Sequence, residues 1–294
     1  MKKRILITGV TGFLGSYLAK RLLSVGYEVV ALKRKSSPLR RVESISSNIT
    51  FFDVEDLDYD DLFFKCGKIN TIIHTATCYG RNNESVSDVF SANTEFPLRL
   101  LDAGNRAGVE LFLNTDTILD KYLNLYSLSK NQLLQWGKFF SIHEKMRFAN
   151  IRLEHFYGPD DDSTKFTTLV IDSCLRNIPE LKLTRGEQKR DFIYIDDVVS
   201  AYVVLLENAE FFDCSFLEFE VGTGQPIEIR EFAKLVHRLS ASKTHLAFGA
   251  LPYREGEVMT SRADITGLSA LGWHCQYDIE TGLTKVIKHE RGLR

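Results

Sequence analysis

Hydrophobic and polar positions follow two different periods along the first half of the chain. Short runs rich in β-branched and aromatic residues predict strands at 4–8, 28–32, 49–53, 71–75, 110–114 and 148–152. Longer amphipathic stretches between them predict helices at 13–26, 85–108 and 125–144. Because strands that alternate with helices build right-handed βαβ units, this order predicts an α/β fold with a doubly wound parallel sheet.

The composition shows no bias toward nucleic acid or membranes. Of the 294 residues, 44% are hydrophobic and 26% are charged, and the formal net charge is −2. We therefore expect small-molecule chemistry, with no nucleic-acid or membrane partner. The basic start MKKRILITGV precedes an apolar run that Thr8 and Gly9 interrupt too early for an export signal. The five cysteines are scattered and odd in number, which favours a reducing compartment, and we expect a cytoplasmic protein.

Three glycines separate the first predicted strand from the first predicted helix, in TGVTGFLG (8–15). Glycines there allow a tight turn, close approach of the backbone to a pyrophosphate and close packing of the helix, whose N-terminus attracts the anion. This context predicts a Rossmann-type dinucleotide-binding turn, with a purely structural turn as the alternative. The expected cofactor contacts are Gly9, Thr11, Gly12, Phe13, Leu14 and Gly15.

The end of the second strand predicts which dinucleotide binds. Many NAD-binding units place an acidic residue there for the ribose hydroxyls, whereas this chain has Lys33, Arg34 and Lys35. Three cations would attract a 2′-phosphate, so NADPH is favoured over NADH. A solvated basic loop is the alternative.

Later strands supply further candidates for the cofactor. Asp53 and Val54 close the third strand and are expected near the adenine. His74 and Ala76, at the end of the fourth strand, are expected to line the cofactor, although a histidine there could equally be packed in the core.

Candidate acid-base chemistry lies in NTDTILDKYLNLYSLSK (114–130). Tyr126 and Lys130 stand four residues apart, so on a helix they share one face, where an ammonium can lower the pKa of a phenol. Thr117 precedes them after a predicted strand, at the edge where open α/β sheets bind ligands. An ordinary polar loop entering a surface helix is the alternative.

The strand–helix alternation loosens after about residue 160, where aromatic residues, glycine and proline increase. This change predicts a smaller lobe at the carboxyl edge of the sheet. We expect residues 1–158, with about 191–222, to form the dinucleotide-binding Rossmann domain. Residues of about 159–190 and 223–294 are then expected to form a C-terminal α/β substrate lobe.

The ordered motifs together resemble the extended short-chain dehydrogenase/reductase family of nucleotide-sugar epimerases, dehydratases and reductases, over nearly the whole chain. The resemblance rests on the glycine turn, IHTAT (73–77), Asn93, Thr117 with Tyr126-x-x-x-Lys130, FYGPDDD (156–162), RDFIYIDDVVSAYVVLLE (190–207), VGTGQPIEIREFAKLV (221–236), REGE (254–257) and ADITGLSALGW (263–273).

This resemblance implies roles for the candidate residues. Tyr126 would be the acid-base group, Lys130 would lower its pKa and hold the nicotinamide ribose, and Thr117 would hydrogen-bond the substrate oxygen. Asn93 falls where the family has an asparagine near the cofactor. A homodimer through the helices at 85–108 and 125–144 is common in the family, although their outer faces show no decisive apolar stripe in the sequence.

Departures from the family pattern narrow the expected reaction. Family dehydratases follow the threonine with an Asp-Glu pair, whereas here Ile118 and Leu119 follow Thr117, so water elimination is not expected. The loop to Tyr126 is also short for an epimerase or dehydratase. The expected activity is NADPH-dependent reduction of a nucleotide-linked 4-keto-deoxy sugar. An NAD-dependent 4-epimerase and a non-catalytic dinucleotide-binding sensor remain the alternatives.

The motifs NTDT, YSLSKNQ and RLEHFYGP most resemble CDP-sugar 4-ketoreductases of O-antigen biosynthesis. This resemblance implies CDP-4-keto-3,6-dideoxy-D-glucose as the substrate. His155 replaces an asparagine that seats the nucleotide diphosphate in the family. Arg190 and Arg254 are candidates for the diphosphate, and each could instead pair with a nearby glutamate.

Other polar and aromatic features receive no role. The three aspartates at 160–162 are expected to form a solvated loop, and nothing else supports a metal site. Trp136 and Trp273 are expected in the core.

Overall fold

A computed structural model describes residues 3–293 and divides the chain into two compact units. The first unit comprises residues 1–152 and 202–219, and the second comprises 153–201 and 220–294. These bounds differ from the predicted division mainly at 191–201, which was assigned to the cofactor domain and falls in the second unit. No helix among the described residues is long and apolar enough to cross a bilayer.

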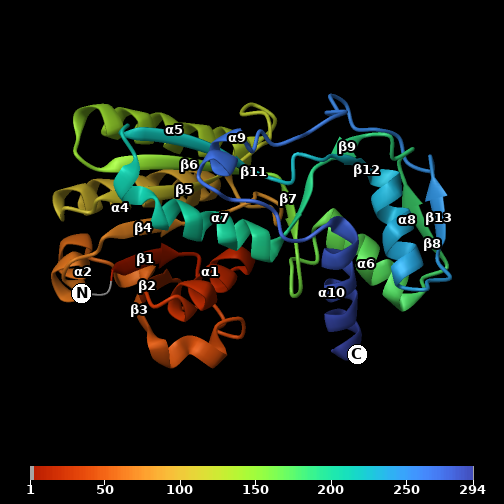
Figure 1. Cartoon of the computed structure of the whole chain (residues 1–294), viewed down its shortest axis with the longest axis horizontal. Helices are drawn as coiled ribbons and strands as arrows, with labels where there is room; N and C mark the ends of the chain where they lie inside the picture. The colour runs from red at the N-terminus through yellow and green to blue at the C-terminus, as the bar shows by residue number, and fades with distance from the viewer. Residues whose placement is uncertain (1–2, 294) are drawn as a thin grey trace. The chain divides into compact units, whose positions relative to one another are not determined.

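A seven-stranded sheet organises the first unit, with strand order β11-β6-β5-β4-β1-β2-β3 (Figure 1). The four pairs β1–β2, β2–β3, β1–β4 and β4–β5 are parallel. The order reverses direction between β1 and β4, which is the switch point where doubly wound sheets bind ligands. The predicted α/β fold is therefore confirmed. The strands are β1 (Arg4–Thr8), β2 (Glu28–Lys33), β3 (Ile49–Asp53), β4 (Thr71–His74), β5 (Leu111–Thr117), β6 (Arg147–Leu153) and β11 (Phe216–Val221).

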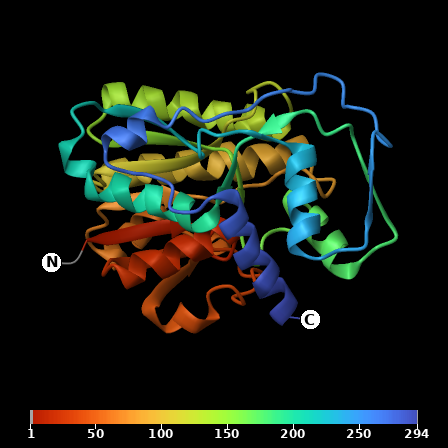
Figure 2. The same ribbon diagram turned by 45° about the vertical axis from the view of Figure 1, so that its right-hand side comes forward.

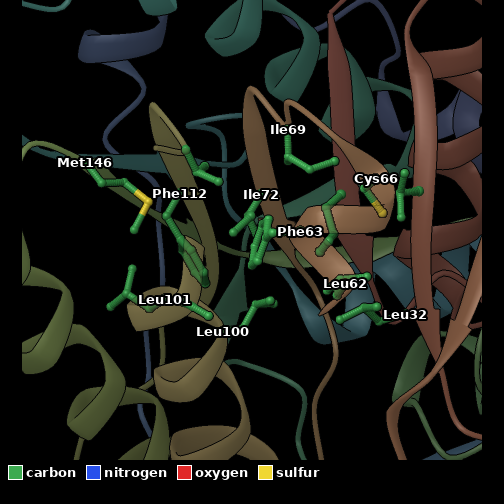
Figure 3. Close-up of a cluster of buried hydrophobic side chains, with 14 of the residues drawn as sticks. Leu32, Leu62, Phe63, Cys66, Ile69, Ile72, Leu100, Leu101, Phe112 and Met146 are labelled. Atoms are coloured by element: carbon green, nitrogen blue, oxygen red, sulfur yellow. The ribbon is translucent and has the colours of Figure 1, made fainter. Parts of the chain in front are cut away.

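Helices cover both faces of this sheet. A buried cluster packs Leu62 of α2, Leu100 of α4 and Leu134 of α5 against Leu6, Ile72 and other sheet residues (Figure 3). Because successive strand residues face opposite sides, Ile5 and Ile7 point to the other face. There α1 packs against β1 and β2, and both α1 and β1 appear in red in Figure 2. The elements are α1 (Phe13–Ser24), η1 (Glu43–Asn48), η2 (Val54–Asp56), α2 (Tyr59–Cys66), α3 (Val86–Phe90), η3 (Ser91–Glu95), α4 (Phe96–Arg106), α5 (Leu125–His143), α7 (Ile195–Glu207) and η4 (Ala209–Phe211).

The helix predicted at 85–108 is interrupted. It starts with a capping box at Ser85, continues as α3, passes through the π-helical segment η3 and resumes as α4. Pro97 lies in the first turn of α4 and has no N–H to continue an α-helical ladder, so the wider π-turn accommodates it. The helix predicted at 125–144 is confirmed as α5, capped by the side chain of Asn124.

The second unit is built from short strand pairs and three longer helices. Strands β7 and β10 pair in parallel, as do β8 and β13, whereas β9 and β12 are antiparallel. Trp273 is buried here, as predicted. The elements are β7 (His155–Tyr157), α6 (Phe166–Arg176), β8 (Glu180–Leu183), β9 (Lys189–Arg190), β10 (Phe192–Tyr194), β12 (Ile227–Glu228), α8 (Ile229–Leu239), β13 (His245–Phe248), α9 (Thr266–Ala270) and α10 (Ile279–Gly292).

Two side chains differ from their predicted surroundings. Asp161 does not lie in a solvated loop, because its side chain is 2% exposed and pairs with Lys165 at 3.0 Å. Trp136 is not in the core but is 44% exposed on α5. Phe139 and Ile142 are exposed on the same helix, so α5 carries an apolar stripe that the sequence pattern did not reveal.

Candidate active site

The candidate site is built where five parallel strands end at one edge of the sheet. The final residues of β1 to β5 are Thr8, Lys33, Asp53, His74 and Thr117. Each is polar or charged, and each follows a largely apolar strand. Because parallel strands end together, chemistry-bearing side chains that are distant in sequence gather at this edge.

The glycine turn after β1 has the geometry that a pyrophosphate requires. Gly9 has φ +70°, a conformation that favours glycine, and a Cβ at Gly15 would lie 2.1 Å from Gly9 O. A Cβ at Gly12 would meet only Gly9 O, at 3.1 Å, so the space in front of Gly12 is otherwise open. The N-cap residue of α1 is Gly12, which has no side chain to cap the first turn of the helix. An uncapped helix start beside an open glycine fits a dinucleotide phosphate.

The basic segment after β2 is partly neutralised by carboxylates. Lys33 Nζ lies 2.5 Å from Asp53 Oδ1, and Lys35 Nζ lies 2.6 Å from Asp56 Oδ2. Arg34 is exposed and has no ion-pair partner among residues 3–293. Of the three predicted cations, Arg34 is therefore the one whose charge is most available to a 2′-phosphate. Asp53 and Val54 are half-buried beside this segment.

His74 is fully buried and hydrogen-bonded. Its Nδ1 lies 2.8 Å from Thr8 Oγ1, which also accepts the N–H groups of Thr75 and Ala76 at 3.2 and 3.1 Å. Since this hydroxyl already accepts two bonds, its own proton goes to Nδ1, and the His74 proton lies on Nε2, which has no partner. Burial holds the pKa of His74 well below its usual value. This geometry matches the packed alternative for His74, while Ala76 remains beside the glycine turn, because a Cβ on Gly9 would lie 2.7 Å from Ala76 N.

Asn93 ties the loop after β4 to α5. Its Oδ1 accepts the N–H of Cys78 at 2.7 Å, and its Nδ2 donates to Cys78 O at 2.8 Å and to Ser129 Oγ at 2.9 Å. The side chain lies in the π-helical segment η3 and is fully buried. Asn93 thus holds the loop that follows β4, and its predicted contact with the cofactor stays a prediction.

Thr117, Tyr126 and Lys130 come together at the end of β5 and the start of α5. The Thr117 side chain lies close enough to the Tyr126 hydroxyl to lower the pKa of the phenol. The Lys130 side chain is 1% exposed, and its Nζ donates to Thr115 O at 2.9 Å. The structure therefore brings together the three residues that the sequence pattern singled out, but Lys130 is directed to the backbone of β5.

The electrostatics of this trio favour a protonated phenol. Burial raises the pKa of Tyr126 well above its usual value, Tyr79 and Asp116 raise it further, and the neighbouring Thr117 side chain lowers it. Burial lowers the pKa of Lys130 to about 8. Lowering of the Tyr126 pKa by Lys130, as the sequence suggested, is not the dominant effect in this structure.

Residues that the sequence analysis did not single out complete the surroundings of Tyr126. The Tyr79 ring centroid lies 5.0 Å from that of Tyr126, and the Arg81 guanidinium lies 4.7 Å from the Tyr79 ring. Asp116 is buried next to Thr117 and pairs with Lys121. The motif NTDT contains Asp116, but only the fold shows that a lysine five residues later returns to it.

The substrate-side candidates lie in the second unit. Arg190 Nη2 lies 2.5 Å from Glu257 Oε1, so Arg190 has the ion-pair partner that the sequence left open. Arg254 is exposed, with no ion-pair partner among the described residues. His155 is half-buried, and its Nδ1 lies 3.1 Å from Glu154 Oε2.

A Rossmann-type sheet with this glycine turn and a Tyr-x-x-x-Lys pair beside a threonine defines a short-chain dehydrogenase/reductase of the extended type. The chain belongs to the NAD dependent epimerase/dehydratase family, whose model matches residues 5–215. Members of this family use an NAD(P) dinucleotide to modify nucleotide sugars.

Comparison with individual proteins supports this membership. The chain is 34% identical to the CDP-abequose synthase of Salmonella muenchen and 33% identical to that of Salmonella typhimurium, and each match covers 98% of both chains. Among solved structures, it resembles UDP-glucose 4-epimerase from Thermotoga maritima, with TM-score 0.85, 23% identity and 99% of both chains covered. It also resembles a Bacillus cereus UDP-glucuronic acid 4-epimerase, with TM-score 0.86, 22% identity and 99% and 100% coverage.

Proposed function

We propose that this protein is an NADPH-dependent reductase of a nucleotide-linked 4-keto-deoxy sugar. The substrate we propose is CDP-4-keto-3,6-dideoxy-D-glucose, which would yield CDP-abequose for O-antigen and lipopolysaccharide biosynthesis. The observation that carries the proposal is the grouping of Thr117, Tyr126 and Lys130 at the end of β5 and the start of α5. Thr117 is followed by apolar residues where eliminating enzymes need acids. The identity of about one third to two CDP-abequose synthases, over nearly the whole chain, supports the choice of sugar.

Reduction of a ketone requires a proton donor at the carbonyl oxygen. Because the pKa of Tyr126 is held well above its usual value, its hydroxyl is protonated at neutral pH and can donate to that oxygen. Thr117 can share the same oxygen through its own hydroxyl, which stabilises the charge that develops there.

The cofactor side of the proposal rests on the first unit. When NADPH is bound, it supplies the hydride that the carbonyl carbon accepts. The start of α1, at Gly12, Phe13 and Leu14, would hold its pyrophosphate, and Arg34 would hold its 2′-phosphate. Lys130 would bind the nicotinamide ribose from its buried position at the start of α5.

On the substrate side, we propose that Arg254 and Arg190 bind the diphosphate. Arg254 is exposed and unpaired among the described residues, whereas Arg190 would have to exchange Glu257 for a phosphate oxygen. His155 would take the place of the asparagine that family members use near the diphosphate. We also propose a homodimer, because Trp136, Phe139 and Ile142 form an exposed apolar stripe on α5.

The test is NADPH oxidation with CDP-4-keto-3,6-dideoxy-D-glucose, run beside NADH and beside a 4-keto-6-deoxy sugar on another nucleotide. We expect turnover with NADPH and the CDP sugar, and NMR of the product gives the configuration at C4. An axial hydroxyl identifies the abequose-type product and an equatorial hydroxyl the paratose type. Conversion of a nucleotide sugar by tightly bound NAD, without consumption of NADPH, would instead establish the epimerase.

A further inference from the structure

An ion pair beneath the catalytic threonine lies in a buried polar network. The Asp116 side chain is fully buried in β5, and the side chain of Lys121 is 20% exposed. Lys121 Nζ donates to Asp116 Oδ2 at 2.6 Å and to Thr117 O at 3.1 Å. The other carboxylate oxygen, Asp116 Oδ1, accepts the N–H of Thr117 at 2.7 Å.

These bonds fix both main-chain polar groups of one residue. The N–H of Thr117 is held by Asp116, and its carbonyl is held by Lys121. The Thr117 hydroxyl accepts the N–H of Leu119 at 3.2 Å. Every polar group of Thr117 therefore has a partner, and two of the three depend on the ion pair.

The carboxylate is also anchored to the sheet. Asn150 Nδ2, on β6, donates to Asp116 Oδ2 at 2.9 Å and to Glu218 Oε2 at 2.9 Å, while its Oδ1 accepts from Asn114. A buried carboxylate is costly unless it is paired and hydrogen-bonded, and this one has three hydrogen-bond donors. Asn124 already caps α5 at the far end of the loop between Thr117 and Tyr126. The hydrogen bonds of Asp116 are therefore not needed to start the helix, and their effect falls on Thr117.

We propose that Asp116 and Lys121 are positioning residues, a buried ion pair that sets the main chain of Thr117 and thereby the position of its side chain beside Tyr126. The inference rests on the proposed reductase function for its catalytic consequence. Neither residue need touch the substrate. Lys121 lies in the short loop after β5, and its bonds to Asp116 and Thr117 hold the start of that loop in place.

The test compares Lys121→Met with Lys121→Arg, and uses Lys65→Met as the matched control. Lys65 forms an exposed pair with Asp61 on α2, far along the chain from the site. For Lys121→Met we expect kcat for NADPH-dependent reduction of the CDP sugar to fall about 100-fold, as for a small misplacement of a catalytic group. KM and the NADPH dissociation constant should stay within about threefold. Lys121→Arg, which keeps the charge and the donors, should recover most of the loss.

Hydrogen exchange of the peptide spanning residues 111–125 provides a readout that needs no substrate. Lys121→Met should exchange faster at the amides of Thr117 and Leu119, while Lys65→Met should match the wild type. Unchanged exchange in Lys121→Met, or unchanged kcat in an active enzyme, overturns the inference. If the wild type does not reduce the CDP sugar, the proposed function fails, and exchange still decides whether the pair orders Thr117. Should Lys121→Met not fold, Lys121→Gln, which keeps an NH₂ donor group but loses the charge, takes its place with the same criteria.

Discussion

Lys33 Nζ lies 2.5 Å from Asp53 Oδ1, and the two residues stand directly opposite one another at the ends of β2 and β3. The carboxylate thus neutralises the first of the three cations that follow β2. A basic cluster in the sequence becomes, in the fold, one ion pair at Lys33, a second at Lys35 and a single unpaired guanidinium at Arg34.

Arg34→Ala is expected to weaken NADPH binding about tenfold and to leave NADH binding unchanged. A charged hydrogen bond to the 2′-phosphate contributes about 1.5–3 kcal/mol, and tenfold corresponds to about 1.4 kcal/mol. Fluorescence titration with both dinucleotides measures the effect. Lys35→Ala is the control, since its ammonium already pairs with Asp56, and it should change the NADPH affinity less. An equal loss of affinity for NADH and NADPH would show that Arg34 does not bind the 2′-phosphate.

Gly12→Ala and Gly15→Ala should separate binding from folding. A methyl group at Gly15 would lie 2.1 Å from Gly9 O, so we expect the free energy of unfolding to fall by at least about 3 kcal/mol. Gly12 has φ −77°, and a Cβ there would make one tight contact, 3.1 Å from Gly9 O, which a shift of a few tenths of an ångström relieves. Gly12→Ala should therefore fold with a loss of about 1 kcal/mol. It should nevertheless bind dinucleotide at least tenfold more weakly. Denaturant unfolding and titration measure the two effects, and undiminished binding by Gly12→Ala would rule out the phosphate site.

Tyr126→Phe removes the proposed proton donor while keeping the ring. We expect kcat to fall about 10²–10⁴-fold, with the NADPH affinity retained, because a general acid contributes that much to the rate. Tyr122→Phe is the control, since Tyr122 lies in the same short loop but is 80% exposed. Near-normal turnover by Tyr126→Phe would identify Tyr126 as the wrong acid.

The buried neutral His74 should make stability depend on pH. Its folded pKa is depressed by burial, so the unfolded state binds a proton more readily than the folded state. The free energy of unfolding is therefore highest, as far as His74 affects it, above the unfolded pKa of about 6.5. It decreases as the pH falls from there toward the folded pKa, by up to about 1.4 kcal/mol per pH unit. Urea unfolding of the wild type and of His74→Gln between pH 7.5 and 5 measures this. The prediction is wrong if the two proteins show the same slope.

Phe139→Glu on α5 should convert a homodimer into a monomer, because a charge in the apolar stripe would be buried at the interface. Light scattering after size exclusion gives the mass. Phe64→Glu is the control, since Phe64 is 87% exposed on α2, outside the stripe. A wild-type protein that is already monomeric at micromolar concentration would contradict the proposal.

The sequence predicted the sheet because its strands are apolar runs bounded by turn residues, and it predicted Thr117, Tyr126 and Lys130 because their spacing is local. It did not predict the partners of charged side chains, which depend on strands that meet only in the fold. Lys33 with Asp53, Arg190 with Glu257 and the bond from Asn150 to Asp116 are of this kind. The break near Asn93 was missed because Pro97 is tolerated in a first turn, so its presence alone did not predict a π-turn.

The interleaving of the two units has a consequence for synthesis on the ribosome. Strand β11, at one edge of the seven-stranded sheet, is the last of its strands to emerge, long after its neighbour β6. Until residues 216–221 leave the exit tunnel, β6 is an edge strand with no partner on one side. Several of its side chains are apolar and become buried in the folded protein, and Phe148 cannot yet stack on Phe216. Chains that stall between residues 153 and 216 should accordingly be the ones that chaperones hold or that aggregate.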